Sequence, residues 1–105
     1  MTTIDEYLKE VAQTAPLTRE EEQELLAAVR LKGTGCEEME LLEKALSWLV
    51  ASLLPQYQRQ GRTNEDLIEA GKEGLRKAAQ QYNPETDEYF YQFAVPFIRE
   101  QMQRR

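Results

Sequence analysis

Aromatic side chains are concentrated near the end of this 105-residue sequence, in the segment EYFYQFAVPFIREQMQRR (residues 88–105). Five of the nine aromatic residues fall between Tyr89 and Phe97, and two arginines close the segment. Exposed rings can stack on nucleobases, and nearby guanidinium groups can meet phosphates. The same rings could instead form an apolar core, and both interpretations stay open at this point.

Helical spacing divides this segment into two stripes. Residues that recur every four positions predict a buried stripe, namely Phe90, Ala94 and Ile98. The adjacent stripe is the candidate stacking surface, with Tyr89, Phe93, Pro96, Phe97 and Glu100. Polar and basic residues that could reach nucleic acid follow in Arg99, Gln103, Arg104 and Arg105.

The sequence contains few of the residue types that catalysis and metal binding usually require. The sequence has no histidine and one cysteine, Cys36, which excludes an internal disulfide, the usual zinc ligand sets and histidine-based nucleophile pairs. Carboxylates are plentiful, but they follow helical spacing and none stands out as an acid/base pair. We therefore expect no enzyme, no metal site and no cofactor.

Charge is distributed unevenly along the chain. The net charge of −6 lies within residues 1–55, whereas residues 56–105 carry equal numbers of acidic and basic side chains. The basic patch that is typical of whole nucleic-acid-binding domains is absent. The start of the sequence lacks the pattern of a secretory signal, and no apolar run is long enough for a membrane span. These features predict a cytoplasmic protein without a membrane partner.

The chain reads as a single all-α domain, a compact bundle of four to five helices over residues 1–105, with an acidic upstream segment (1–32) and core helices (37–105). A first helix is expected at residues 3–13. Thr18 followed by Glu21 forms a capping box that predicts a second helix. Its buried face would contain Leu25, Leu26 and Val29, with Leu31 as a further candidate.

A third, central helix is predicted at residues 37–54, ending or kinking before Pro55. Its apolar face would be Met39, Leu42, Leu46, Leu49, Val50 and Leu53. A second capping box, Thr63 with Asp66, opens a fourth helix to about Tyr82, with Leu67, Ile68, Leu75 and Ala78 inside. Gly71 and Gly74 in that helix cost about 1 kcal/mol each relative to alanine, so we expect a close neighbour there. The last helix should begin near Asp87 or Glu88.

Several segments together resemble region two of bacterial sigma factors of the sigma-70 family, with the segment that precedes it. EDLIEAGKEGLRKAAQQYNPE is similar to the family's second conserved region, and FYQFAVPFIREQMQRR to its promoter-melting helix. DEYLKEVAQTAPLTREEEQELL resembles the stretch upstream. The AVP sequence is closest to alternative sigma factors of sporulation and stress response.

The resemblance implies a function in transcription initiation. In the family, the fourth helix binds a coiled coil of the largest subunit of RNA polymerase core. The matching positions here are Asp66, Glu69, Ala70, Lys72 and Arg76. The melting helix implies binding and opening of promoter −10 DNA, including a single-stranded form, by the aromatic stripe and by Arg99, Gln103 and Arg104.

Departures from the family pattern keep other functions open. Pro96 and Phe97 stand where primary sigma factors have two tryptophans, and Tyr91 and Gln92 replace a serine and a threonine. The sequence ends within or just after the melting helix, so a second protein would supply upstream promoter recognition. One alternative is a polymerase-binding module without its own DNA recognition, as half of a split sigma factor or as a decoy. Another is a plain helical protein-interaction domain, with the fourth helix presenting an ordinary solvated face.

Overall fold

The computed structural model describes residues 9, 17–58, 63–83, 85 and 89–104. Over these residues the chain forms α-helices and one short 3-10 turn, with no strand, which confirms the all-α class. The helices are α2 (Arg19–Lys32), α3 (Glu37–Ala45), α4 (Ser47–Leu53), α5 (Asn64–Gln81) and α6 (Phe90–Arg104). The helix predicted at residues 3–13 lies outside the described residues apart from Lys9, and so does the predicted start of the last helix at Asp87 or Glu88.

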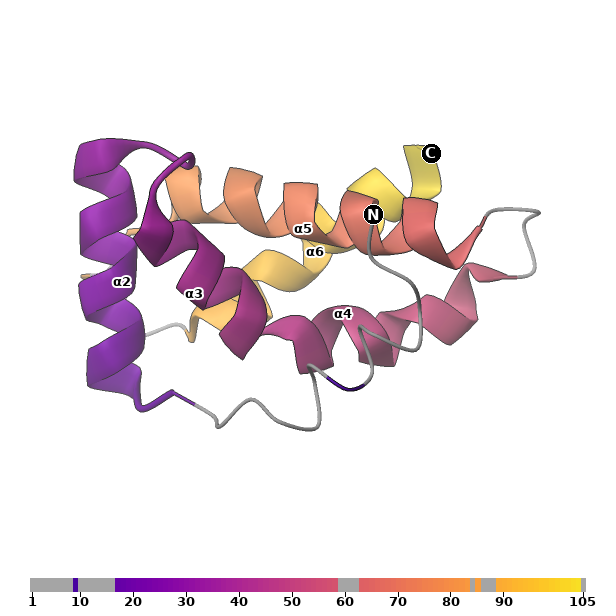
Figure 1. Ribbon diagram of the computed structural model, residues 1–105, viewed down its shortest axis with the longest axis horizontal. Helices are drawn as coiled ribbons and strands as arrows, with labels where there is room; N and C mark the ends of the chain where they lie inside the picture. Colours follow the sequence, from indigo (N-terminus) through magenta and orange to yellow (C-terminus); the bar gives the residue numbers. More distant parts are fainter. Residues whose placement is uncertain (1–8, 10–16, 59–62, 84, 86–88, 105) are drawn as a thin grey trace.

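The helices form a bundle in which α5 and α6 lie along each other (Figure 1). The chain reverses between them, so that the end of α6 lies near the start of α5 (Figure 1). α2 stands across one end of this pair, and α3 and α4 lead from α2 toward the opposite end (Figure 1).

The predicted capping box starts α2. The Thr18 hydroxyl accepts a hydrogen bond from the Glu21 amide at 3.1 Å, and the Glu21 carboxylate accepts one from the Thr18 amide at 3.1 Å. Two amides that the helix cannot satisfy internally are thereby satisfied. The helix ends at Lys32 and is capped by Gly33, whose φ of 88° favours glycine. Leu26 and Val29 are buried as predicted, but Leu31 is 88% exposed and does not belong to the core.

The predicted central helix is two helices, because the backbone departs from helical geometry at Leu46 (φ −103°, ψ 13°). The Ser47 hydroxyl donates a 2.7 Å hydrogen bond to the Lys44 carbonyl. A serine that bonds a nearby carbonyl can bend a helix, and this bond lies next to the break. The expected end before Pro55 is confirmed, since α4 stops at Leu53 and Leu54–Gln56 form a 3-10 turn.

The Thr63 hydroxyl accepts a hydrogen bond from the Asp66 amide at 3.1 Å and caps α5, which is one half of the predicted capping box. The two glycines of α5 are close-packing positions, also as predicted. A Cβ atom on Gly74 would lie 2.6 Å from the Ile98 Cα and 2.8 Å from the Phe97 carbonyl oxygen, both in the α6 backbone. A Cβ atom on Gly71 would lie 2.5 Å from a methyl of Val50 on α4. The absence of a side chain at residue 74 therefore sets the distance between α5 and α6.

One apolar core runs continuously through the described helices. The predicted stripe of the α3–α4 region is buried throughout: Met39, Leu42, Leu46, Leu49, Val50 and Leu53. It packs with the inner face of α5, formed by Leu67, Ile68, Leu75 and Ala78, and with Phe90, Ala94 and Ile98 of α6. The buried half of the aromatic segment is thus confirmed as core.

Candidate functional site

The first candidate surface is the polar face of α5. Its buried positions recur at helical spacing and leave Asp66 and Glu69 exposed, with Lys72 and Arg76 partly exposed beside them. These four predicted polymerase-contact residues therefore share one side of the helix. Asp66 lies in the first turn, where a negative charge also stabilises the positive end of the helix dipole.

Ala70 does not belong to that surface. Its exposed fraction is 0%, and it packs within the apolar core. The spacing of residues along α5 turns this methyl group inward together with Gly71 and Leu67. The expectation that Ala70 lies on the exposed face is therefore wrong, and the surface consists of charged side chains.

α3 contributes to the same region, which the sequence did not indicate. Arg76 Nε lies 2.9 Å from Glu43 Oε1, an oxygen that is buried and lacks a well-aligned hydrogen bond. Burial raises the pKa of the Glu43 carboxyl, against the lowering effect of the Arg76 and Lys72 charges. A polar groove of about 290 Å³ runs here between the two helices, lined by Glu40, Glu43, Lys44, Glu69, Lys72 and Arg76.

The second candidate surface is the aromatic stripe of α6. The rings of Phe93 and Phe97 lie 5.2 Å apart between centroids, at an angle of 38°. Both are partly buried, and Phe93 also meets the edge of Tyr82 with centroids 5.4 Å apart. These rings are therefore intermediate between the core and an open stacking platform. Tyr89, in contrast, is 47% exposed.

The predicted phosphate-binding arginines already have partners within the chain. Arg99 Nη1 donates to Gln56 Oε1 at 2.7 Å and to the Tyr57 hydroxyl at 3.4 Å. Arg104 Nη2 lies 3.0 Å from Glu100 Oε1 in an exposed ion pair. Gln103 is exposed on the last turn of α6, and Arg105 lies outside the described residues. A phosphate would have to compete with these contacts.

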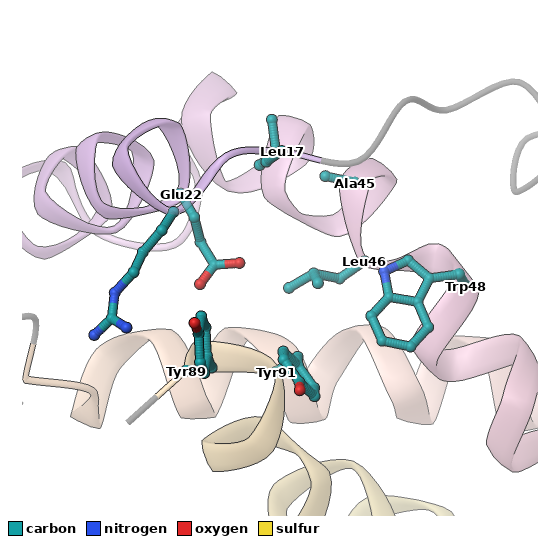
Figure 2. A pocket seen from close by; sticks show the side chains of 8 residues that line it. Leu17, Glu22, Ala45, Leu46, Trp48, Tyr89 and Tyr91 are labelled. Atoms are coloured by element: carbon teal, nitrogen blue, oxygen red, sulfur yellow. The ribbon is translucent and has the colours of Figure 1, made fainter. Parts of the chain in front are cut away.

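A cavity of about 250 Å³ with aromatic walls adjoins the start of α6 (Figure 2). Tyr91 lies between Trp48 and Tyr89, with ring centroids 5.8 Å from each. The Arg19 guanidinium lies 4.6 Å from the centre of the Tyr89 ring, within range of a cation–π interaction. Leu17, Ala45 and Leu46 complete the apolar wall.

Glu22 of α2 points into this cavity (Figure 2). Burial raises the pKa of its carboxyl, while a hydrogen bond from the Phe90 backbone N–H and the charge of Arg19 act in the lowering direction. The carboxylate thereby accepts an amide at the first residue of α6, where the helix cannot satisfy that amide internally. An acidic side chain and an arginine thus stand at the edge of a cavity with aromatic walls.

The sequence stripes identified Tyr89 but missed the rest of this cavity. Trp48 is 43% exposed and lies off the apolar stripe of its helix, which is the signal that could have marked it as a surface residue. Arg19 and Glu22 lie one turn apart on α2, but Tyr91 is about 70 residues further along the sequence and shares no pattern with them. Their proximity depends on how α2 crosses the start of α6.

Metal ligation and membrane insertion find no support in the described part of the chain. Its histidine, cysteine, aspartate and glutamate side chains form no group of three or more that could hold an ion. Among the same residues, no helix has the length and apolar character that crossing a bilayer requires.

No protein-family model matches this chain. Over 99 residues, which cover 93% of the chain, it is 31% identical to RNA polymerase sigma factor SigA of Lactococcus lactis subsp. cremoris. It is also 31% identical over 99 residues to RNA polymerase sigma factor SigA of Lactococcus lactis subsp. lactis strain IL1403. The chain spans about a quarter of the length of these curated relatives, 27% and 26% respectively. This similarity supports a relationship between the chain and the sigma-70 family.

Proposed function

We propose that the chain is a sigma-like transcription initiation domain that binds RNA polymerase core and contributes to recognition and opening of promoter −10 DNA. The observation that carries the proposal is the 31% identity to SigA sigma factors over 99 residues, which cover 93% of the chain. The resemblance of α5 and α6 to sigma region two agrees with it in sequence order and spacing.

Polymerase binding is assigned to the charged face of α5, with α3 at its edge. The face offers Asp66 and Glu69 beside Lys72 and Arg76, an arrangement that suits a partner helix pair with charges of both signs. Glu43 holds Arg76 at the edge of the groove through the 2.9 Å contact. A coiled coil of the largest polymerase subunit is the partner that the family resemblance implies.

Charge reversal of Asp66 and Glu69 to lysine tests this assignment. The double variant should lose capture of RNA polymerase core in a pull-down while its circular dichroism spectrum stays helical. A matched control reverses Glu20 and Glu37, which are also exposed, lie in the first turns of α2 and α3, and change the net charge equally. Capture that survives the first double reversal, or is lost equally with the control, contradicts the assignment to α5.

Promoter contact is assigned to the partly exposed rings of α6 and to the cavity beside Tyr89. Taking a base out of the stack costs a few kcal/mol, and stacking on an aromatic side chain returns about 1–3 kcal/mol per base. Phe93 and Phe97 offer adjacent rings, and Tyr89, Tyr91 and Trp48 offer a second aromatic surface. Both lie on or next to the helix that resembles the melting helix.

Fluorescence anisotropy with a labelled single-stranded oligonucleotide of −10-like sequence tests the DNA contact, with and without polymerase core. Phe93→Ala together with Phe97→Ala should weaken binding by about 2–6 kcal/mol, the value of two stacked bases. Because the rings are partly buried, the melting temperature must be measured in parallel, and binding is compared well below it. Unchanged affinity of a folded double variant would remove these rings from the DNA surface.

A polymerase-binding module without DNA recognition is the second candidate, and the arginine contacts favour it. Arg99 is held by Gln56 and Tyr57, and Arg104 by Glu100, so the cations nearest the aromatic stripe are already engaged. If the chain is a polymerase-binding module without DNA recognition, it should capture polymerase but bind no oligonucleotide, even when core enzyme is present. Salt-dependent oligonucleotide binding would favour the first candidate, because arginine–phosphate contacts release counterions.

A further inference from the structure

A further cavity opens between α2 and α3, next to the two proposed surfaces. Its volume is about 380 Å³, larger than the 250 Å³ of the cavity beside Tyr89. Apolar side chains form its floor, namely Leu17, Leu25 and Leu41. Charged side chains form its rim, namely Glu21, Glu24 and Lys44. We call this feature the α2–α3 groove.

The floor of the α2–α3 groove is an extension of the core that remains open to solvent. Leu17 and Leu25 are partly buried and pack against the core cluster. Leu41 is 47% exposed, although it lies one residue from fully buried Leu42. A leucine left at the surface beside other apolar side chains gains free energy when a partner covers it.

The rim restricts the kind of partner. Glu24 is exposed and forms no ion pair with any residue that the structure describes, and one Glu21 oxygen remains after the other accepts the Thr18 amide. Lys44 lies at the end that adjoins the polar groove of α3 and α5. The surrounding half of the chain, residues 1–55, carries the whole net charge of −6. The electrostatic potential therefore favours a cationic partner.

Residues 1–16 precede the groove directly in sequence, but their charge suits it poorly. This segment carries Asp5, Glu6 and Glu10 against one cation, Lys9. Placing it on the groove would add acidic groups next to Glu21 and Glu24. A basic segment from another protein that also carries apolar side chains can cover the apolar floor and pair with the acidic side chains of the rim.

We propose that the α2–α3 groove binds a helical segment of a partner protein that presents large aliphatic side chains flanked by lysine or arginine. An amphipathic helix laid in a groove places residues four positions apart on the same face. The aliphatic side chains cover Leu17, Leu25 and Leu41, and the flanking cations lie near Glu21 and Glu24. The site adjoins the two proposed surfaces, because it shares Leu17 with the cavity beside Tyr89 and Lys44 with the polar groove of α3 and α5. Its other lining residues do not belong to the α5 face or to the aromatic stripe of α6.

The test uses three labelled 14-residue helical peptides and the full chain. The first carries two leucines four residues apart with arginines beside them, the second replaces the arginines by glutamates, and the third replaces the leucines by serines. Only the first should bind in fluorescence anisotropy, and its affinity should fall with added salt. Leu41→Ser should weaken it about tenfold or more, because the leucine contact is lost. Glu24→Lys should weaken it and reduce the salt dependence.

Leu31→Ser is the matched control, because Leu31 is exposed on α2 but does not line the groove. It should leave peptide affinity unchanged, and circular dichroism checks that each variant remains folded. Equal binding of the arginine and glutamate peptides, no binding of the arginine peptide, or no effect of Leu41→Ser overturns the proposal. So does nuclear Overhauser contact between Leu41 and Ile4, Tyr7 or Leu8 in the free protein, because the chain's own segment would then fill the groove.

Discussion

The α5–α6 pair and the α2–α3 pair bury their apolar side chains in different ways. Where α5 meets α6, Gly74 brings the helices so close that the α6 backbone occupies the place of a side chain. Where α2 meets α3, two helices that are tied by the Lys32–Glu38 ion pair at 2.6 Å leave a groove with an exposed leucine. At the first contact the backbone approach leaves no room for a ligand, whereas the side chains between α2 and α3 leave a cavity. The candidate partner surfaces therefore lie on the outer faces of α5 and α6 and in the groove between α2 and α3.

The largest expected effect is at the α5–α6 contact. Gly74→Leu would place a side chain where the Ile98 Cα and the Phe97 carbonyl oxygen lie, so α6 must move or detach. Overpacking of a core costs about 1–3 kcal/mol, and more when backbone rather than a flexible side chain must yield. Thermal unfolding should show a large loss of stability or no cooperative transition.

Gly35→Leu is the matched control, because a Cβ atom on Gly35 has no neighbour within 4 Å. It should change the melting temperature little. A Gly74→Leu variant that melts like the wild type would show that the two helices are not in backbone contact.

A smaller effect separates the two pairs by burial. Ile98→Ala on α6 removes a fully buried side chain and should cost about 2–5 kcal/mol in urea unfolding. Leu41→Ala on α3 removes a side chain that is 47% exposed, and should stay within about 0.5 kcal/mol, the range of ordinary surface substitutions. Similar losses of unfolding free energy at the two sites would mean that the α2–α3 groove is filled in the free protein and does not differ from the α5–α6 contact.

The smallest effect concerns Glu22, which joins the two regions by accepting the Phe90 amide. Burial raises the pKa of this carboxyl in the folded protein, so the folded state binds the proton more tightly than the unfolded state. Its contribution to stability is then fully present below the unfolded pKa of about 4.5 and is lost as the pH rises through the raised value. Glu22→Gln should flatten this decline while its side-chain oxygen still accepts the amide.

The measurement is the free energy of unfolding from about pH 4 to pH 7 for the wild type and the variant. Glu24→Gln, two residues further along α2 and exposed, serves as the control and should follow the wild-type curve. Parallel curves for the wild type and Glu22→Gln would show that the carboxyl is not held in a raised-pKa environment.

Local sequence signals predicted the helices well. The Thr18 capping box, the Thr63 cap and the stop before Pro55 each depend on residues a few positions apart, and the structure has all three. The apolar stripe of residues 37–54 was also correct, but the break at Leu46 was not seen. At that break the Ser47 hydroxyl bonds the Lys44 carbonyl. The spacing of apolar residues carries no information about such a local hydrogen bond or about the break.

The candidate surfaces were predicted less completely, because exposure depends on packing between distant segments. Asp66 and Glu69 are exposed on α5 as expected, and their contact with polymerase stays a prediction, whereas Ala70 is buried by the core beneath it. Phe93 and Phe97 lie between the two interpretations that the sequence left open. Glu43 lies close to Arg76, and Trp48 close to Tyr91, because of the tertiary arrangement. The spacing of these residues in the sequence gives no sign of either contact.

The contact at Gly74 also restricts how α6 can respond to a partner. The Ile98 Cα occupies the site above Gly74, so sliding α6 along α5 by one residue would bring a different side chain against the α5 backbone. Translation is therefore blocked, whereas tilting about this point keeps the contact. We expect the crossing to act as a fixed pivot, with Phe93 and Phe97 changing direction on binding but not their register against α5.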